Sequence, residues 1–553
     1  MTTSDIEGTG RRWRIWPWRN LASPEAALPA LAPYHSLKPH TLRRVFGFIA
    51  LMLFCFVYGF FFSVLAPYYF AFLILPILFV MFLTIWALPD ANWAPTQQLT
   101  WFFYAFFIVL ICWPNYIAIA LPGLPWITLI RLTSFPMTLF LLISYSISPQ
   151  FRADLSRSLR TVPAIPTLLC IFIVIQTISI GESKNISSSI QKFIVAQTTW
   201  TATFFAAAYL FLRPGQIKRW ALILWAMAIL VSIIGIWEFR IGRLPWAGHI
   251  PSFLKIDDAA VQGILAAHMR SYTNLYRAEA TFSTPLGLAE YLALTLPFAY
   301  HFCAPRWPIK LRLAAFASIP LILYADFLTN SKLGMVGALA ASSFYLLMAT
   351  FRYWRRNKSS LMAASVFFFY PASIGLVALL MAASHRFHIL IMGDGSHAAS
   401  TQARIEQMHV GLAKVLHWPF GYGIGQAAIT ISAVGDFVTI DSYFLSVLVE
   451  YGILGFIVYY GIFAIAIYEG SRRYLADTTA NEDQSFLLPI TASFVAFLVA
   501  KFVFSQQDNH PVVFMMLGAL LGLIAARRTL TQSRRGPHRG NVVRKLQSPM
   551  PVR

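Results

Sequence analysis

The sequence predicts an all-α membrane protein that crosses the bilayer many times. Of its 553 residues, 58% are hydrophobic and only 12% are charged, and the mean hydropathy is +0.63. This composition is too apolar for a soluble domain. The apolar runs are about 17 to 25 residues long, the length of a membrane-spanning helix, whereas the strands of outer-membrane barrels are about ten residues long. We therefore exclude a soluble enzyme and expect a helical bundle.

Fourteen apolar runs have the length and composition of spans. They cover residues 45–66, 67–88, 99–121, 125–147, 162–180, 191–212, 219–239, 283–303, 312–328, 333–350, 361–383, 441–468, 485–504 and 511–526. The ninth and tenth are short and close together, and only the Ala66-Pro67 break separates the first two. We accordingly expect 12 to 14 transmembrane helices, with fourteen as the preferred number.

The distribution of basic residues orients these spans. If the N-terminus is cytoplasmic, 30 of the 43 Lys and Arg residues fall in inner segments, which satisfies the positive-inside rule. We expect a basic cytoplasmic segment (1–44), a transmembrane domain (45–526) and a basic cytoplasmic tail (527–553). Topology and anionic lipid headgroups thus explain the net charge of +21, and nucleic-acid binding is discounted.

The cysteines predict neither a metal site nor a disulfide. All four fall in or at the end of predicted helices, without CxxC or Cys/His spacing and without a pair in an outer loop: Cys55, Cys112, Cys170 and Cys303. We interpret them as packing residues.

Two outer loops, 240–282 and 384–440, are longer than connections usually are, and such loops are commonly functional or disordered. Both carry cations against the positive-inside trend. These include Arg270 and Arg277 in the first loop, and Arg386 and Arg404 in the second. Because guanidinium groups bind phosphate oxygens in a two-pronged geometry, an anionic ligand on the outer side would explain these cations.

Arg277 and Glu279 stand directly before a predicted span. Inserting an arginine fully into the bilayer costs roughly 2.5 to 3.5 kcal/mol, so Arg277 either extends its charge into the interface or meets an anion or carboxylate.

Asp441 begins another span, where it either caps the helix N-terminus or serves the site. Glu290 and Glu450 lie inside spans and should face a polar cavity or a charged partner.

The second long loop contains a predicted amphipathic helix. Arg404, Met408, Gly411, Leu412 and Val415 recur at helical intervals, and a proline at position 419 ends the pattern.

Three glycines follow this helix and superficially resemble a nucleotide-binding fingerprint. No strand precedes Gly421, Gly423 and Gly425, so a tight glycine turn is favoured. The spacing of the loop histidines matches no standard zinc set. His397 and His409 remain secondary candidates for a general base, because histidine titrates near neutral pH.

Three segments in order resemble the bacterial O-antigen ligase and polymerase superfamily. They are RAEATFSTPLGLAEYLAL, LTNSKLGMVGALA, and ARIEQMHVGLAKVLHWPFGYGIGQA followed by DSYFLSVLVEYGILGF. The agreement covers roughly residues 276 to 460, whereas the N-terminal half agrees only in hydropathy. The resemblance implies a GT-C-like helical bundle with a large periplasmic loop. It also implies a glycosyltransferase that takes a glycan from undecaprenyl diphosphate in the bacterial inner membrane, without metal or cofactor.

The resemblance implies roles for individual residues. Arg277, Lys332 and Arg404 would bind the donor diphosphate and stabilise the charge that develops as it leaves. The motif arginine of the family is Lys332 here, which keeps the charge but loses the two-pronged geometry. Glu279 or Ala280 replaces the usual glycine.

The largest departure is at the start of the helix after the long loop. Where ligases carry His-Asn, this chain has Asp441-Ser442, and polymerase-type members commonly have an acid there. A polymerase that joins lipid-linked repeat units is therefore the preferred interpretation, with Asp441 accepting a proton from the acceptor hydroxyl. Glu279 is the second catalytic candidate, or else it orients Arg277.

Two alternatives remain open. A ligase would move a finished glycan to lipid A core or to a protein. A lipid or solute transporter would tend to show inverted repeats with polar sites at the midplane, whereas charge gathers here at one face. The expected partners are a lipid-linked glycan and membrane lipids. The basic C-terminal tail either docks a chain-length regulator or holds the inner leaflet.

Overall fold

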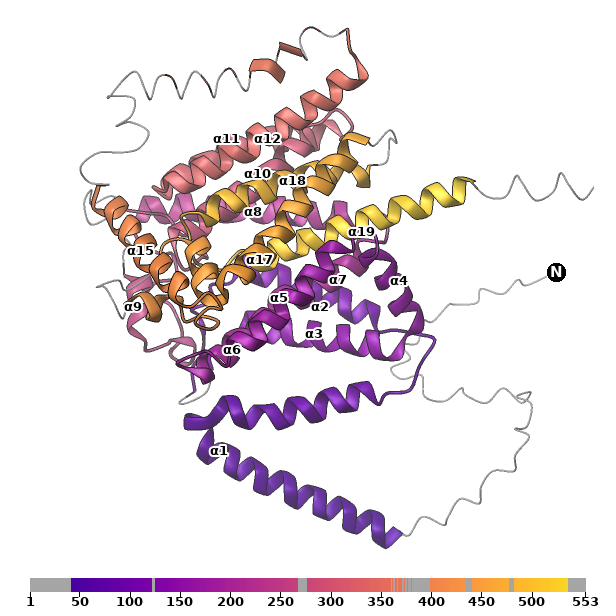
Figure 1. The fold of residues 1–553 in the computed structure, drawn as a ribbon, viewed down its shortest axis with the longest axis vertical. Coiled ribbons are helices and arrows are strands. Elements are labelled where there is room, and N and C mark those ends of the chain that lie inside the picture. The colour runs from indigo at the N-terminus through magenta and orange to yellow at the C-terminus, as the bar shows by residue number, and fades with distance from the viewer. Residues whose placement is uncertain are drawn as a thin grey trace, which may run out of the picture. The chain divides into compact units, whose positions relative to one another are not determined.

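The computed structural model describes residues 41–121, 125–266, 276–359, part of 361–379, 398–432, 440–476 and 482–535. Its first helices are α1 (Thr41–Trp86), α2 (Thr96–Cys112), α3 (Leu129–Ile147), α4 (Pro149–Leu159), α5 (Ala164–Ser179), α6 (Ile186–Ala196), α7 (Ala202–Leu210), α8 (Gln216–Ile241) and α9 (Ala259–Leu265). The later ones are α10 (Pro285–Phe302), α11 (Ile309–Leu328), α12 (Lys332–Arg356), α15 (Ala398–His417), α16 (Ala427–Ser432), α17 (Tyr443–Ala476), α18 (Leu487–Lys501) and α19 (His510–Arg535). Figure 1 shows these helices along the chain.

The other described elements are short. A π-helical turn, η1 (Gln197–Thr201), joins α6 to α7, and 3-10 turns lie at η2 (Ser252–Leu254) and η4 (Asp483–Phe486). Strands β1 (Ala118–Ile119) and β2 (Ile127–Thr128) pair antiparallel between α2 and α3.

The chain divides into two units, Met1–Val64 and Leu65–Arg553. The described part of the first unit is the beginning of α1. This helix is interrupted at Tyr69, where φ is −129° and ψ is 24°, close to the break predicted at Pro67. All other helices belong to the second unit.

The predicted all-α polytopic class is confirmed. Within the described residues, eight helices are long and apolar enough to cross a membrane, and the bent pair α4 and α5, at 103° to each other, would make nine. Two shorter apolar helices cover Phe72–Trp86 and Thr96–Cys112. Thirteen of the fourteen expected runs coincide with helical segments, and the run 361–383 lies largely outside the described residues.

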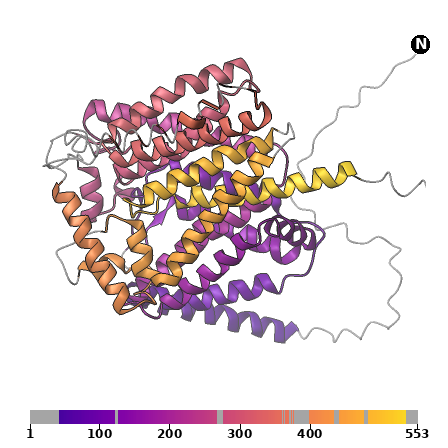
Figure 2. The same ribbon diagram turned by 45° about the horizontal axis from the view of Figure 1, so that its top comes forward.

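The centre of the second unit is formed by helices that are apolar on every side. All residues of α19 from 511 to 525 are buried, and nearly all of α10 is buried too, as expected for helices surrounded by other helices. Small residues permit the close packing. A Cβ atom on Gly518 of α19 would lie 2.3 Å from the carbonyl oxygen of Phe204 in α7. Figure 2 shows α19 passing among its neighbours.

The helix ends gather at two opposite ends of this unit. At one, the C-terminal ends of α2, α8, α11 and α18 meet the N-terminal ends of α3, α10, α12, α17 and α19; we call this the site end. The other, the basic end, collects cations such as Lys218, which forms a 2.7 Å ion pair with Glu482. This separation agrees with the predicted orientation, which stays a prediction.

Candidate functional site

A buried carboxylate on α8 holds the loop that carries Arg277. Glu238 is fully buried and accepts hydrogen bonds from the Tyr276 hydroxyl at 2.7 Å and from the backbone N–H groups of Glu279 at 3.1 Å and Ala280 at 2.6 Å. Ala280 has a φ of 50°, a conformation that a non-glycine residue adopts only when its surroundings enforce it. Glu238 therefore fixes the conformation of the 276–281 loop.

The opposite side of this loop pairs with the end of α11. The Arg277 Nε donates to the carbonyl oxygen of Thr329 at 3.0 Å, and the N–H of Ala278 donates to that of Leu328 at 3.1 Å. Thr329 lies three residues before Lys332, the exposed first residue of α12. The 276–281 loop is therefore hydrogen-bonded to the turn that leads from α11 to Lys332.

Glu279 is almost completely buried, with 1% of its surface exposed. Burial, followed by the nearby Glu238 carboxylate, raises the pKa of Glu279 to about 9, whereas Arg277 has the opposite effect. Because its carboxyl group is buried, Glu279 is poorly placed to meet a bulky acceptor, and its expected role in orienting Arg277 stays a prediction.

Arg404 and Asp441 form an ion pair. The Arg404 Nε lies 3.0 Å from a carboxylate oxygen of Asp441, and the N–H of Asp441 donates to the Gln407 side chain at 3.1 Å. Both charged side chains are about 40% exposed, so each remains accessible to a ligand. Two residues assigned separately from sequence are therefore neighbours.

Asp441 does not occupy the cap position of the following helix. Helix α17 begins at Tyr443, which makes Ser442 the residue before its first turn. The Asp441 carboxylate instead contacts Arg404, so the structure does not show the capping alternative, and the role of Asp441 at the site stays a prediction.

The segment between α18 and α19 joins these parts. The Ser505 hydroxyl donates to the carbonyl oxygen of Ile440, next to Asp441. The Gln506 side chain accepts from the Thr284 hydroxyl at 3.1 Å, and the Asp508 carboxylate accepts from the Ser283 hydroxyl at 2.8 Å. Residues 505–508 thus connect the Asp441 segment to the end of the Arg277 loop.

A buried ion pair lies beneath this segment. The Lys501 ammonium is 3.0 Å from the Glu290 carboxylate, and both side chains are fully buried. Lys501 also donates to the carbonyl oxygen of Gln506, and Asn509 donates to Glu290 at 3.0 Å. The polar partner predicted for Glu290 is therefore Lys501, and the pair fixes the ends of α10, α18 and α19 together.

The glycine series is a structural turn, as favoured from sequence. Gly421, Gly423 and Gly425 all have positive φ values between 72° and 102°. The N–H of Gly423 donates to the carbonyl oxygen of Glu450 at 3.1 Å, and a Cβ atom on Gly421 would lie 2.5 Å from that oxygen. The turn packs against the break in α17 at Gly452, so the glycines serve close backbone approach.

Helix α15 exists as predicted and ends before Pro419, but its packed face differs from the expected one. Gln407, Gly411 and Val415 are buried, whereas Met408 and Leu412 are about 40% exposed. The reason is the Leu445 side chain of α17, which lies so close to Gly411 that a Cβ atom there would be 2.6 Å from it. Figure 1 shows α15 lying across the site end.

The secondary candidates are separate from these contacts. His409 is exposed on α15. Arg270, Arg386 and His397 lie outside the described residues. Among the residues that the structure describes, no group of three or more His, Cys, Asp or Glu side chains could hold a metal ion.

Sequence reasoning missed Glu238 and Asp508. Glu238 is an acid near the end of an apolar run, which is a signal of function in a membrane protein. Asp508 belongs to a polar SQQDN segment that connects two spans. Short connections between spans are commonly polar, so this segment gave no signal of function.

Comparison with known proteins adds one family. Residues 316–460 match the model of the O-antigen ligase family, a range that includes α12, α15 and the first half of α17. No curated protein sequence matches the chain. The matched range contains Lys332, Arg404 and Asp441, and Arg277 precedes it.

Proposed function

This chain belongs to the O-antigen ligase and polymerase superfamily through residues 316–460, and we propose that it is an inner-membrane polysaccharide polymerase. It would join repeat units linked to undecaprenyl diphosphate on the periplasmic face. Family membership supports an enzyme of the glycosyltransferase type that acts on lipid-linked glycans in a membrane.

The observation that carries the proposal is the ion pair between Arg404 and Asp441 at the site end. Arg404 is predicted to bind the diphosphate and Asp441 to accept the proton, and the ion pair places the two side chains together. Arg404 uses its Nε for Asp441, and its two terminal amino groups have no hydrogen bond to another residue that the structure describes. Arginine has five N–H donors, so the two terminal amino groups of Arg404 can bind phosphate oxygens while its Nε stays bonded to Asp441.

The chemistry follows from this arrangement. The acceptor hydroxyl attacks the anomeric carbon of the donor glycan, the bond from that carbon to the diphosphate oxygen breaks, and Asp441 takes the hydroxyl proton. Arg277, Lys332 and Arg404 stabilise the negative charge on the departing diphosphate. The products are a lengthened lipid-linked chain and undecaprenyl diphosphate.

The acid at position 441 favours a polymerase over a ligase, because ligases of the family carry His-Asn where this chain has Asp441 and Ser442. Product analysis separates the two. A polymerase makes long chains from the lipid-linked repeat alone, whereas a ligase needs lipid A core or a protein acceptor. A transporter makes no new glycosidic bond in detergent solution.

The decisive variant is Arg277→Ala in the source cells. Long polymer should disappear while the protein level in the membrane stays unchanged. Arg240→Ala is the matched control, because Arg240 is exposed at the C-terminal end of α8 and forms no hydrogen bond or ion pair with another residue that the structure describes. Full-length polymer in the Arg277→Ala strain would rule out the proposed role.

A further inference from the structure

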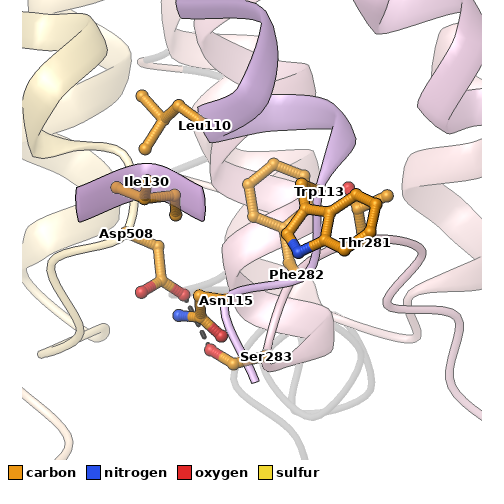
Figure 3. Close-up of a pocket in the computed structure, with 8 residues that line it drawn as sticks. All are labelled: Leu110, Trp113, Asn115, Ile130, Thr281, Phe282, Ser283 and Asp508. Atoms are coloured by element: carbon orange, nitrogen blue, oxygen red, sulfur yellow. Dashed lines mark hydrogen bonds between the residues drawn. The ribbon is translucent and has the colours of Figure 1, made fainter. Parts of the chain in front are cut away.

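A small pocket at the site end has no role in the chemistry above. Its cavity volume is about 40 Å³. The ends of α2 and α3, the Arg277 loop and the segment before α19 line it, and its lining includes Trp113, Asn115, Thr281, Ser283 and Asp508. Figure 3 shows Asp508, Asn115 and Ser283 together on one side, with the Trp113 indole beside them.

The polar side of this pocket can form hydrogen bonds with hydroxyl groups. The Asp508 carboxylate accepts from Ser283 with one oxygen at 2.8 Å, and its other oxygen has no hydrogen bond to any residue that the structure describes. The same holds for the side-chain amide of Asn115. An accepting carboxylate and an amide that both donates and accepts match the hydroxyls of a sugar.

The apolar side of the pocket is rigid. The Trp113 indole N–H donates to the carbonyl oxygen of Ile117 at 3.1 Å, which fixes the ring. The Thr281 hydroxyl donates to the carbonyl oxygen of Ile111 at 2.6 Å and so ties the Arg277 loop to the end of α2. A fixed aromatic ring beside polar groups resembles sites that recognise one apolar and one polar surface of a ligand.

Size limits what can enter. A cavity of about 40 Å³ holds only a few water molecules, since one water needs roughly 10 to 15 Å³ of such space, and it is too small for a whole sugar ring. One edge of a ring with one or two hydroxyls fits, while the rest of the ring stays outside.

We infer that this pocket binds the edge of a sugar ring in the lipid-linked glycan, with Asp508 and Asn115 bonded to its hydroxyls beside Trp113. The inference rests on the proposed function, because it gives a sugar subsite to the same enzyme. Continuity with the site supports it: Ser283 belongs to the loop of Arg277, and Ser505, three residues before Asp508, contacts Ile440 beside Asp441.

The test measures occupancy of the pocket, independently of catalysis. Asn115→Cys is made in the full-length chain after its four cysteines, Cys55, Cys112, Cys170 and Cys303, are changed to alanine. A maleimide then labels the thiol in detergent, with and without lipid-linked glycan extracted from the source cells. Ile119→Cys, exposed in β1 of the same connection, is the matched control.

The glycan at ten times its Kd should slow labelling at position 115 about tenfold, because only about a tenth of the protein stays unoccupied. Labelling at position 119 should not change. Undecaprenyl diphosphate without sugar should not protect position 115. Equal protection by this bare carrier, or no protection by the glycan, would overturn the inference.

The outcome is separable from that of the proposed function. Protection of position 115 without formation of new glycosidic bonds by the wild-type protein would leave the subsite standing and remove the polymerase. Polymer formation without protection of position 115 would support the polymerase and remove the subsite. Asp508→Asn adds a kinetic measurement: a raised KM for the lipid-linked glycan with kcat little changed supports the subsite, and an unchanged KM contradicts it.

Discussion

The carboxylate of Glu238 lies 2.6 Å from the backbone N–H of Ala280, a residue held at a φ of 50°. This contact links a helix from the first half of the chain to the loop that carries Arg277. One turn earlier on the same helix, a Cβ atom on Gly235 would lie 3.7 Å from the Cβ of Ala278, an ordinary contact, so α8 is a neighbour of the loop there too.

Removal of the Glu238 carboxylate should disturb the conformation of the 276–281 loop and so reduce polymer formation. Glu238→Ala leaves two buried backbone N–H groups without an acceptor, at about 1 to 3 kcal/mol each, and we expect at least a tenfold loss of polymer. Glu238→Gln keeps one acceptor oxygen and should restore part of the activity. Trp237→Ala, at an exposed neighbour, is the control. Polymer length in cells measures the effect, and normal polymer with Glu238→Ala would refute it.

The Arg404 and Asp441 pair should matter for activity and little for stability. An exposed ion pair contributes about 0 to 1 kcal/mol, so Arg404→Ala and Asp441→Asn should shift the thermal midpoint by only a few degrees at most. Both should abolish polymer formation. Glu406→Ala, an exposed change on the same helix, controls for general effects on α15. A large drop in the midpoint would indicate a structural role for the pair.

The buried pair of Glu290 and Lys501 should behave in the opposite way. Glu290→Ala leaves an uncompensated buried ammonium, which costs about 3 to 5 kcal/mol. Thermal unfolding in detergent should show strong destabilisation. The double change Glu290→Leu with Lys501→Met removes both charges and should recover much of the loss. A double variant less stable than Glu290→Ala would show that the pair acts through something other than charge.

Two glycines of α17 should respond to alanine with opposite signs. Gly452 has a φ of 68°, and a Cβ atom there would lie within van der Waals overlap of the Pro419 carbonyl oxygen, so Gly452→Ala should destabilise by more than about 1 to 2 kcal/mol. At Gly461 the nearest atom is an ordinary 3.6 Å away, and Gly461→Ala should gain about 0.5 to 1 kcal/mol. Thermal midpoints decide this, and equal shifts would contradict the expected geometry.

Stability should fall with rising pH because of Glu279. Its pKa rises from 4.5 in the unfolded chain to about 9 when folded, so between these values the unfolded chain has released a proton that the folded chain keeps. The unfolded state then binds fewer protons, and the free energy of unfolding decreases as pH increases. Glu279→Gln should flatten this slope between about pH 5 and pH 8. An unchanged slope would mean that Glu279 is ionised in the folded protein.

The class of fold could be predicted from the sequence because bilayer length and apolar composition constrain each helix separately. Thirteen of the fourteen expected runs recur as helical segments, and Gly421 with its two partner glycines was identified as a turn by local chemistry alone. The motif residues were also accessible from sequence, since Arg277, Lys332 and Arg404 are cations on the outer side of the predicted membrane and Asp441 begins a span within a segment that resembles the superfamily.

The sequence by itself thus determined the helices, their order and the charged residues that distinguish this protein. Only the tertiary structure decided which of these residues are neighbours: it paired Arg404 with Asp441 and buried Glu279. It also made Glu238 the support of the Arg277 loop and assigned residues 505–508 to the centre of the site end. The physical reason is that spans and turns follow from local composition, whereas contacts across 37 or more residues depend on how the helices pack.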